Sequence, residues 1–454
     1  MANVIKLRKG LDINLQGKAE EKKIQLKSNG KYALVPDDFE GITPKVVVKE
    51  GDKVKAGDAL FVNKQYPEVK FASPVSGTVR EVVRGERRKV LCVKVEADSQ
   101  QEFTDFGKKD AAALTGEQVI NALLEAGLFG YIKQLPYAVS TNPSVMPKAI
   151  FVSALRDKPL AADFQFEVKG QEQDFVTGIQ ALSKIAKTYL GLGIQPDFQT
   201  VIRDMGIDNF AELNIFDGPC PAGNVGVQVN NVDPVNKGEV VWTIGDPTVV
   251  LFIGRLFNTG KVNLTRTVAL CGSEVKNPAY VDMLVGEELS TLLSNSYDAS
   301  KNVRIINGNV LTGKPTTKEG YLGAHTSEIT VIPEGDQADE FLGWILPRFK
   351  QFSVNRSYFS WLQNPWFCSK KKDYALDARV KGGERHMIMS GEYDRVLPMD
   401  IYGEYLIKAI IAGDIDRQEA LGIYEVSPED FALAEFVDSS KLELQRIVRE
   451  GLNI

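Results

Sequence analysis

Two short blocks near the N-terminus constrain the fold of this chain most strongly. Residues 46–60 have the sequence V-V-V-K-E-G-D-K-V-K-A-G-D-A-L, and residues 71–79 have the sequence F-A-S-P-V-S-G-T-V. In both blocks short alternating strand-like segments are separated by turns that contain Gly-Asp or Ser-Pro. This pattern predicts a small β-sandwich or barrelled hairpin domain over residues 28–96.

The two blocks resemble those of the biotinyl/lipoyl carrier domains, whose turns have the form E-G-D-x-V-x-x-G-D-x-L and S-P-x-x-G-x-V. A carrier bears its prosthetic group on a lysine at the hairpin tip between the blocks. Here the tip falls on Tyr66 and Pro67, and the nearby Lys64 lacks a Met-Lys-Met or Asp-Lys-Ala setting. We therefore expect a structural domain, with a lipoyl- or biotin-bearing carrier as the alternative that intact mass would reveal.

The rest of the chain is long enough for further domains. It has 454 residues, 43 % hydrophobic and 25 % charged, so at roughly 100–200 residues per domain three or four domains are expected. Apolar spacing predicts helices over 117–128 and 175–189, and buried strands over 149–154 and 249–253. Alternating strands and helices indicate an α/β domain with a sheet covered by helices.

The last part of the chain divides into a mixed unit and a helical unit. Strands are predicted over 266–270 and 302–306, with a short helix near 286–294, and helical spacing begins at Met399. Ser427-Pro-Glu-Asp has the form of a helix N-cap followed by proline and acidic residues. Four units are predicted. They are an N-terminal segment with the β domain at 1–105, the α/β domain at 106–255, a small α+β module at 256–330, and an aromatic-rich linker with a helical domain at 331–454.

Composition argues against several classes of site. The net charge of −6 does not favour nucleic acid. No stretch approaches the roughly 18 apolar residues of a spanning helix, and residues 1–17 lack the apolar region of a signal peptide. The scattered cysteines predict reduced thiols in the cytoplasm and no iron–sulfur cluster; they are Cys92, Cys220, Cys271 and Cys368. His325 and His386 lie too far apart in sequence to suggest a metal site.

The order of these units, together with two segments, resembles the NqrA family, which belongs to the Na+-translocating NADH:quinone oxidoreductases. The segments are D-G-P-C-P-A-G-N-V-G at 217–226 and R-T-V-A-L-C-G-S at 266–273. More distantly, the chain is similar to RnfC and to the NADH-oxidising flavoprotein subunit of complex I. The resemblance implies a multidomain α/β and α+β fold with a biotinyl/lipoyl-like β domain, a Rossmann-like flavoprotein-type domain, an SLBB/β-grasp-like module and a C-terminal helical domain.

The chain departs from these relatives where they bind redox groups. The flavoproteins hold FMN on a glycine-rich loop, because backbone N–H groups must approach phosphate closely. The matching stretch here is G-L-F-G-Y-I-K-Q-L-P at 127–136, in which only Gly127 and Gly130 remain. Segments 383–400 and 431–441 resemble cluster-binding runs of the relatives but contain no cysteine. The resemblance therefore implies a degenerate FMN site, with neither FMN nor iron–sulfur clusters expected.

The implied function is that of a non-catalytic component of a membrane complex. The complex would couple NADH oxidation by quinone to Na+ export in respiratory electron transfer. This chain would serve as a peripheral scaffold and docking component on the cytoplasmic face of the inner membrane, held by other subunits, especially the membrane subunit NqrB. The substrate class is ubiquinone or menaquinone. The alternatives are an RnfC-like electron-transfer flavoprotein, which absorbance in the flavin and cluster bands would reveal, and a cofactor-free scaffold with no quinone contact.

Two groups of side chains are candidates for recognition. A quinone site needs an apolar cleft with a few hydrogen-bond donors, and the candidates are Tyr32, Phe39, Phe129, Tyr131, Lys133 and Tyr137. The alternative is that these aromatic residues fill the former flavin cavity as core.

The second group combines aromatic and basic residues, as protein interfaces do. It is the candidate docking surface for the membrane partner, with Trp344, Arg348, Trp361, Trp366, Lys370, Lys371 and Lys372. The alternative is an inter-domain core with a solvated lysine cluster. Such interleaving also occurs in nucleic-acid-binding proteins, but the acidic chain has no nucleic-acid motif.

Overall fold

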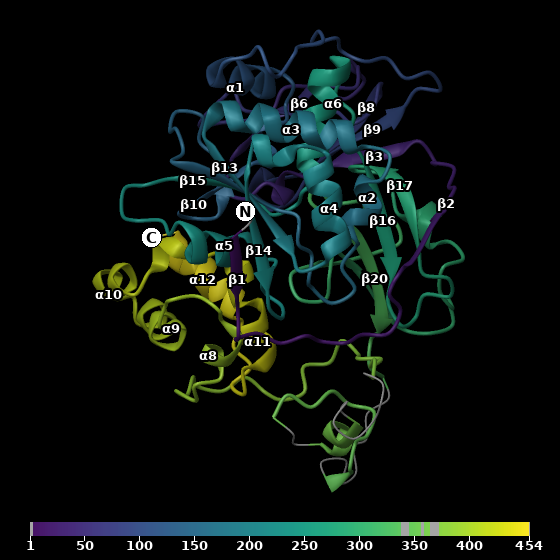
Figure 1. The fold of residues 1–454 in the computed structure, drawn as a ribbon. Coiled ribbons are helices and arrows are strands. Elements are labelled where there is room, and N and C mark those ends of the chain that lie inside the picture. The colour runs from purple at the N-terminus through teal and green to yellow at the C-terminus, as the bar shows by residue number, and fades with distance from the viewer. Residues whose placement is uncertain (1–2, 337–344, 356–357, 364–371, 454) are drawn as a thin grey trace.

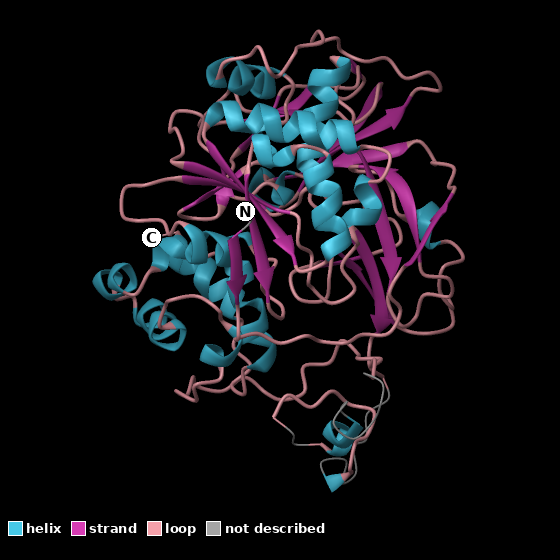
Figure 2. Ribbon diagram, in the orientation of Figure 1, coloured by secondary structure: helices cyan, strands magenta, loops and turns pink. Residues whose placement is uncertain are grey.

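The computed structural model describes residues 3–336, 345–355, 358–363 and 372–453. In this part of the chain four β-sheets and their helices form the larger body, and a group of C-terminal helices lies beside the seven-stranded sheet (Figure 1). Several helices of the larger body lie together on one side of the strands (Figure 2). The chain is therefore a mixed α/β protein built from several sheets, as predicted.

The N-terminal β domain consists of two small antiparallel sheets. The first has the order β3-β9-β8-β5 and the second β4-β6-β7. The strands are β3 (Lys31–Leu34), β4 (Pro44–Val46), β5 (Lys53–Val54), β6 (Ala59–Asn63), β7 (Lys70–Ala72), β8 (Gly77–Arg84) and β9 (Val90–Ala97). The Gly-Asp turns close because the Asp52 and Asp58 carboxylates accept hydrogen bonds from the backbone N–H of Lys49 and Lys55 at 2.7 and 2.8 Å. The predicted β domain is confirmed, and Tyr66 lies at the tip between β6 and β7.

The seven-stranded sheet has the order β1-β14-β13-β12-β15-β10-β11. The five strands from β1 to β15 are parallel, and β10 and β11 add an antiparallel edge. The bounds are β1 (Asn3–Lys6), β10 (Lys133–Leu135), β11 (Val139–Ser140), β12 (Ala149–Ser153), β13 (Lys187–Gly193), β14 (Glu212–Asp217) and β15 (Val241–Ile244). Central strands such as β12 are buried throughout, as expected for a sheet with helices on both faces.

Six helices accompany this sheet: α1 (Gly116–Glu125), α2 (Phe164–Val168), α3 (Glu172–Ile185), α4 (Pro196–Asp204), α5 (Val225–Val232) and α6 (Thr248–Thr259). The predicted helix at 117–128 and the predicted strand at 149–154 are confirmed. The strand predicted at 249–253 was wrong, because these residues lie in α6. Residues 248–257 are all buried, so the apolar run has no polar face that would distinguish a helix from a strand. The helix predicted over 175–189 ends at Ile185, and β13 begins at Lys187.

The strand order reverses between β12 and β15. After β12 the chain adds β13 and β14 on one side, and it then returns to place β15 on the other side of β12. Helices α3 and α6 pack with Ile150 and Val152 of β12, whereas α5 packs with Phe151 on the opposite face. In open α/β sheets such a reversal leaves a crevice at the carboxyl ends of the two strands.

The six-stranded sheet has the order β19-β18-β20-β16-β17-β2. Its strands are β2 (Glu20–Ile24), β16 (Thr265–Cys271), β17 (Ala279–Leu284), β18 (Val303–Asn307), β19 (Lys314–Thr316) and β20 (Glu328–Pro333), and it carries α7 (Ser290–Leu293). The strands predicted at 266–270 and 302–306 are confirmed. The first residues of the chain link two sheets, because β1 joins the seven-stranded sheet and β2 joins this one.

The C-terminal unit consists of short helices whose core is shared with the N-terminal segment and the α/β domain, through residues such as Leu7, Phe216 and Val227. The helices are α8 (Tyr393–Val396), α9 (Gly403–Ala412), α10 (Ile415–Ala420), α11 (Ala432–Val437) and α12 (Leu444–Leu452). Pro428 begins the 3-10 helix η8 (Pro428–Phe431), and the Asp430 carboxylate accepts a hydrogen bond from the Ser427 N–H at 2.9 Å. The helical start predicted at Ser427 is therefore confirmed. Across the described residues, every helix is too short or too polar to span a membrane.

Candidate functional site

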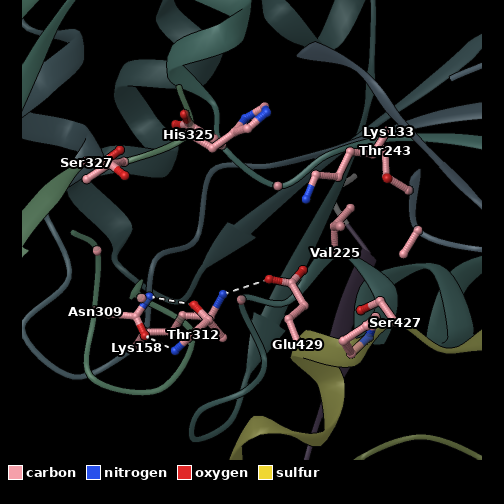
Figure 3. Close-up of a pocket in the computed structure, with 18 of the residues that line it drawn as sticks. Lys133, Lys158, Val225, Thr243, Asn309, Thr312, His325, Ser327, Ser427 and Glu429 are labelled. Atoms are coloured by element: carbon pink, nitrogen blue, oxygen red, sulfur yellow. Dashed lines mark hydrogen bonds and ion pairs between the residues drawn. The ribbon is translucent and has the colours of Figure 1, made fainter. Parts of the chain in front are cut away.

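A cavity of about 320 Å³ lies at the carboxyl ends of β12 and β15, where the strand order reverses. Its walls come from four parts of the chain: the loop after β3, the α/β sheet, the six-stranded sheet and the C-terminal helices. Figure 3 shows Lys133 and Thr243 on one side, His325 and Ser327 on another, and Glu429 with Lys158 below them. Because all four parts contribute, the site exists only when they are packed together.

A buried ion network forms one wall of the cavity. Arg156, which follows β12, contacts Glu167 at 2.6 Å and Asp246 at 2.8 Å, and Arg266 on β16 also pairs with Asp246. Although burial opposes ionisation, Arg266 and Arg156 hold the pKa of Asp246 below its usual range. Burial raises the pKa of Glu167 to about 7 despite the Arg156 guanidinium beside it. The network joins the end of β15 to the six-stranded sheet.

A second charged contact brings the C-terminal helices to the cavity. Lys158 donates to the Glu429 carboxylate at 3.0 Å, a contact drawn in Figure 3. Against the effect of burial, Lys158 holds the pKa of Glu429 below its usual range. The neighbouring Asp157 accepts from the Gly223 N–H at 2.7 Å, and burial raises the pKa of Asp157 to about 6.

The start of α5 faces the same cavity but is already covered by a carboxylate. A helix N-terminus presents free N–H groups and favours anions. Here Asp430 lies so close to Gly226 that a Cβ at that glycine would be 2.4 Å from Asp430 Oδ2. Asn224 also donates to Asp430 Oδ1 at 3.2 Å. The carboxylate occupies the space beside Gly226, so this helix end offers no free site for a phosphate group.

Aromatic residues form the inner wall. The ring centroids of Tyr131 and His325 are 5.5 Å apart, and Phe39 packs on both at 5.0 and 5.8 Å. Among the described residues, the Tyr131 hydroxyl and His325 Nε2 have no hydrogen-bond partner. Burial, and the positive charge of Lys133, lower the pKa of His325 to about 3. This histidine is therefore neutral near pH 7.

The six residues predicted for a quinone site do not meet in one place. Tyr131 and Lys133 line the cavity, and Phe39 lies behind Tyr131. Phe129 is fully buried and packs edge-on against Trp242 at 5.3 Å.

The other two predicted residues lie elsewhere. The Tyr32 hydroxyl hydrogen bonds with Ser28 at 2.9 Å, and Tyr137 lies beside Tyr424 with the ring centroids 5.8 Å apart. Phe39 and Phe129 thus act as core, the alternative that the sequence left open, whereas a quinone contact at Tyr131 and Lys133 stays a prediction.

The remnant glycines of the predicted FMN loop serve domain packing. A Cβ at Gly127 would lie 2.8 Å from the Ala72 N, and one at Gly130 would lie 2.3 Å from the Phe71 ring. Gly127 also has a φ of +70°, which favours glycine. Both positions therefore need glycine because the β domain packs directly against this loop.

The predicted docking surface is described in part. Trp361 lies in the 3-10 helix η6 (Phe359–Gln363), Arg348 stacks on Tyr358 at 5.4 Å, and Lys372 donates to the Phe349 carbonyl at 2.8 Å. The remaining predicted residues, Trp344, Trp366, Lys370 and Lys371, lie outside the described residues. Exposed apolar side chains accompany this segment, among them Ile345, Phe349 and Phe359.

The sequence reasoning missed most of the polar residues of the cavity. Arg156 and Asp246 each follow a strand of the parallel sheet, and the carboxyl ends of such strands are where ligands bind. Because residues 249–253 were wrongly predicted as the strand, Asp246 was not recognised as a residue that follows one. Glu429 was seen only as part of a helix start, since no local pattern indicates its contact with Lys158. Among the described residues, no group of histidine, cysteine and acidic side chains is arranged to hold a metal ion.

Comparison with known proteins covers nearly the whole chain. Family models match an NqrA N-terminal barrel-sandwich hybrid domain at residues 5–98, an NqrA second alpha/beta domain at 114–262 and an NQRA C-terminal domain at 267–318. Among solved structures, an NAD+-reducing [NiFe]-hydrogenase in the air-oxidized state overlaps 76 % of this chain and 61 % of its own, with 13 % identity and a TM-score of 0.37. A likeness that low supports no argument.

Relatives of the same length give the decisive comparison. The NqrA protein of the Na(+)-translocating NADH-quinone reductase of Histophilus somni (strain 2336) is 35 % identical over 457 residues, covering 99 % of both chains. The protein of the same name from Yersinia pestis bv. Antiqua (strain Angola) is 34 % identical over 99 % of this chain and 98 % of its own. The chain therefore belongs to the NqrA family of the Na+-translocating NADH-quinone reductases.

Proposed function

We propose that this chain is the NqrA component of a Na+-translocating NADH:quinone reductase, a membrane complex that couples NADH oxidation by quinone to Na+ export. The observation that carries the proposal is identity of 34–35 % with NqrA proteins of such reductases over at least 98 % of both chains. The RnfC-like alternative is not favoured. The chain is part of an enzyme complex, and in isolation it is not catalytic.

Within that complex the chain acts as a scaffold without a tightly bound redox group. Two observations support this role: Asp430 covers the anion-binding end of α5, and Gly127 and Gly130 are engaged by the β domain. In fold terms, the seven-stranded sheet is a Rossmann-like flavoprotein-type domain and the six-stranded sheet an SLBB/β-grasp-like module. The proposed domain limits are those at 105/106, 255/256 and 330/331.

The protein docks at the cytoplasmic face of the inner membrane through the surface around residues 344–372, with NqrB as its neighbour. Exposed apolar residues such as Phe349 and Phe359 support this placement, because aromatic residues are enriched at protein interfaces. The nearby Lys372 and Arg348 supply positive charge.

Charge reversal of Lys370, Lys371 and Lys372 to glutamate is expected to lower assembly of the complex several-fold. The reason is that like charges at a rim slow association and oppose the bound state. The measurement is the amount of this chain recovered with the membrane partner, together with Na+-dependent NADH:quinone reductase activity of the membranes. Reversal of Lys45, Lys49 and Lys53, exposed lysines of the β domain, applies the same charge change elsewhere. Full assembly of the first variant would reject this docking surface.

Contact with ubiquinone or menaquinone is a second proposed role, located at Tyr131 and Lys133. The supporting observation is the Tyr131 hydroxyl, which is buried at the cavity wall without a partner among the described residues. A quinone carbonyl would accept its hydrogen bond, since burial raises the pKa of Tyr131 and keeps the hydroxyl protonated.

Tyr131→Phe is expected to weaken binding of a short-chain ubiquinone analogue by roughly fivefold to tenfold, the usual worth of one hydrogen bond. Intrinsic tryptophan and tyrosine fluorescence follows the titration. Tyr393→Phe is the matched control, because Tyr393 is equally buried and lies in α8 away from the cavity. Equal affinity of the two folded variants would leave the chain as a scaffold without quinone contact.

A further inference from the structure

The cavity has more hydrogen-bond donors than its own acceptors use. Every acidic side chain that lines it already accepts from a donor or pairs with a cation; these are Asp37, Asp38, Glu40, Asp157, Asp246, Glu328 and Glu429. In contrast, the Tyr131 hydroxyl and His325 Nε2 at the wall are without partners in the described part of the chain. Buried polar groups are rarely left in that state, and a ligand that accepts hydrogen bonds would satisfy both.

Lys133 is the cation with the most capacity left. It contacts Glu40 at 3.4 Å, a long distance for a charged hydrogen bond. The same Glu40 carboxylate binds Arg449 at 2.7 Å, so its charge is compensated without Lys133. In Figure 3 the Lys133 side chain reaches into the cavity on the side of His325. Since an ammonium group has three donors, Lys133 can bind a ligand without breaking the ion pair of Glu40.

Two lysines, Lys133 and Lys314, act electrostatically on the part of the cavity beside His325. Burial lowers the pKa of His325, and the charges of Lys133 and Lys314 act in the same direction, whereas Asp246 opposes them. Lys314 donates to the Asp37 carbonyl at 2.9 Å and lies 3.9 Å from the Asp38 carboxylate. An anion placed here would therefore meet two cations and a neutral histidine whose ring nitrogen can donate.

The size and polarity of the cavity define the class of ligand. Its 320 Å³ correspond to about ten waters at roughly 30 Å³ each, or to one small organic molecule. We propose that the cavity binds a small carboxylate or phosphate anion, held by Lys133 with His325 and Tyr131 as further donors.

This inference goes beyond the proposed function and does not rest on it. A bound anion would contact the α/β sheet through Lys133 and the six-stranded sheet through His325. A ligand that binds the native state stabilises the arrangement that forms its site. The anion would thus tie together two domains of the protein.

The two histidines of the chain allow a direct test on the full-length protein. His325 lies at the cavity, whereas His386 is exposed in the C-terminal part and serves as an internal control. Proton–carbon NMR of labelled histidine rings is recorded while succinate, citrate or inorganic phosphate is added at constant ionic strength. At least one of these probes is expected to shift the His325 signals saturably, with a dissociation constant in the millimolar range or tighter, and to leave His386 unchanged.

Two variants identify the site. Lys133→Gln is expected to weaken the binding of that probe by about tenfold, the worth of a charge-assisted hydrogen bond. Lys94→Gln, which removes a partly exposed lysine paired with Glu81 at 2.8 Å, should leave the affinity unchanged. Absence of a saturable His325 shift with all three probes would overturn the proposal.

Other results would overturn it as well. Parallel shifts of both histidines, or equal affinity in the Lys133→Gln variant, would indicate an adventitious ion only. A short-chain quinone that shifts His325 while no anion competes would assign the cavity to quinone instead. Anion binding and quinone binding are measured with separate probes. A negative result for one proposal is therefore distinguishable from a negative result for the other.

Discussion

Replacing Asp246 with alanine is expected to lower the free energy of unfolding by about 3–5 kcal/mol, the usual cost of removing one partner from a buried ion network. The Asp246 carboxylate lies between the guanidinium groups of Arg156 and Arg266. The side chain of Arg266 is fully buried, and that of Arg156 is 9 % exposed. Without Asp246, Arg266 keeps its hydrogen bond to the Ala324 carbonyl at 3.0 Å and its contact with the Phe252 ring, so its charge would be buried without a carboxylate to compensate it.

The measurement is chemical and thermal denaturation of the variant beside the unmodified chain. Glu81→Ala is the matched control, because it breaks the ion pair with Lys94 between partly exposed side chains, and such pairs contribute about 1 kcal/mol or less. Asp246→Asn keeps the shape of the side chain and allows a folded sample if the alanine variant does not fold. A loss of stability no larger than that of the control would contradict this account of the network.

The pH dependence of the same variant has a definite sign. The pKa of Asp246 is held below its usual range in the folded protein, so its carboxylate stabilises the fold at every pH above the unfolded value of about 4. As the pH falls below that value, the unfolded state takes up the proton first and the contribution is lost. The difference in stability between the unmodified chain and Asp246→Ala is therefore expected to shrink as the pH falls below about 4.

Local patterns in the sequence were sufficient for elements with two distinct faces. Helix α1 has a capping box at Thr115 and an amphipathic sequence, and the β domain has Gly-Asp turns that fix its hairpins. The same kind of pattern gave a wrong prediction for helix α6. Packing buries this helix on all sides, and an apolar run without a polar face fits a strand as well as a helix. Periodicity thus tells a helix from a strand only where one face meets solvent; the fully buried β12 was predicted from its short apolar run alone.

The cavity was harder to predict because its contacts join distant parts of the chain. Tyr131 and Lys133 could be proposed because they lie in the stretch that matches the glycine-rich FMN loop of the relatives. The pairing of Lys158 with Glu429 spans 271 positions, and no local pattern encodes it. Phe129 shows the opposite error: an aromatic residue beside a candidate site was assigned to it, although Trp242 and the sheet surround the ring. Residue type alone does not tell core from binding site.

The helix pair α3 and α6 offers the second large effect. Both helices carry a glycine at their contact, and a Cβ at Gly254 would lie 1.7 Å from the Asp174 carbonyl oxygen. On the other helix, a Cβ at Gly178 would lie 2.2 Å from the Val250 carbonyl oxygen. Backbone atoms cannot turn away as a flexible side chain can, so any added carbon must push the helices apart.

Gly254→Ala is therefore expected to lower the free energy of unfolding by about 3 kcal/mol, at the upper end of the cost of overpacking. Alanine favours an isolated helix by about 1 kcal/mol over glycine, and the steric cost outweighs that gain because the contact is with backbone. Denaturation of Gly254→Ala measures the loss beside Gly383→Ala, whose Cβ would meet no atom within 4 Å. Equal stability of the two variants would mean that the helices separate at little cost.

The double variant Gly178→Ala with Gly254→Ala distinguishes separation of the helices from local strain. Once one methyl group has displaced α6 from α3, the second meets less resistance, so the combined loss of stability is expected to be smaller than the sum of the single losses. Strictly additive losses would indicate that each clash is relieved locally. The displacement would also reach the cavity, because α6 begins at Thr248, directly after Asp246 and Pro247. Lower affinity for the anion in Gly254→Ala, with Lys133 and His325 unchanged, would then show that the packing of α3 on α6 sets the geometry of the binding site.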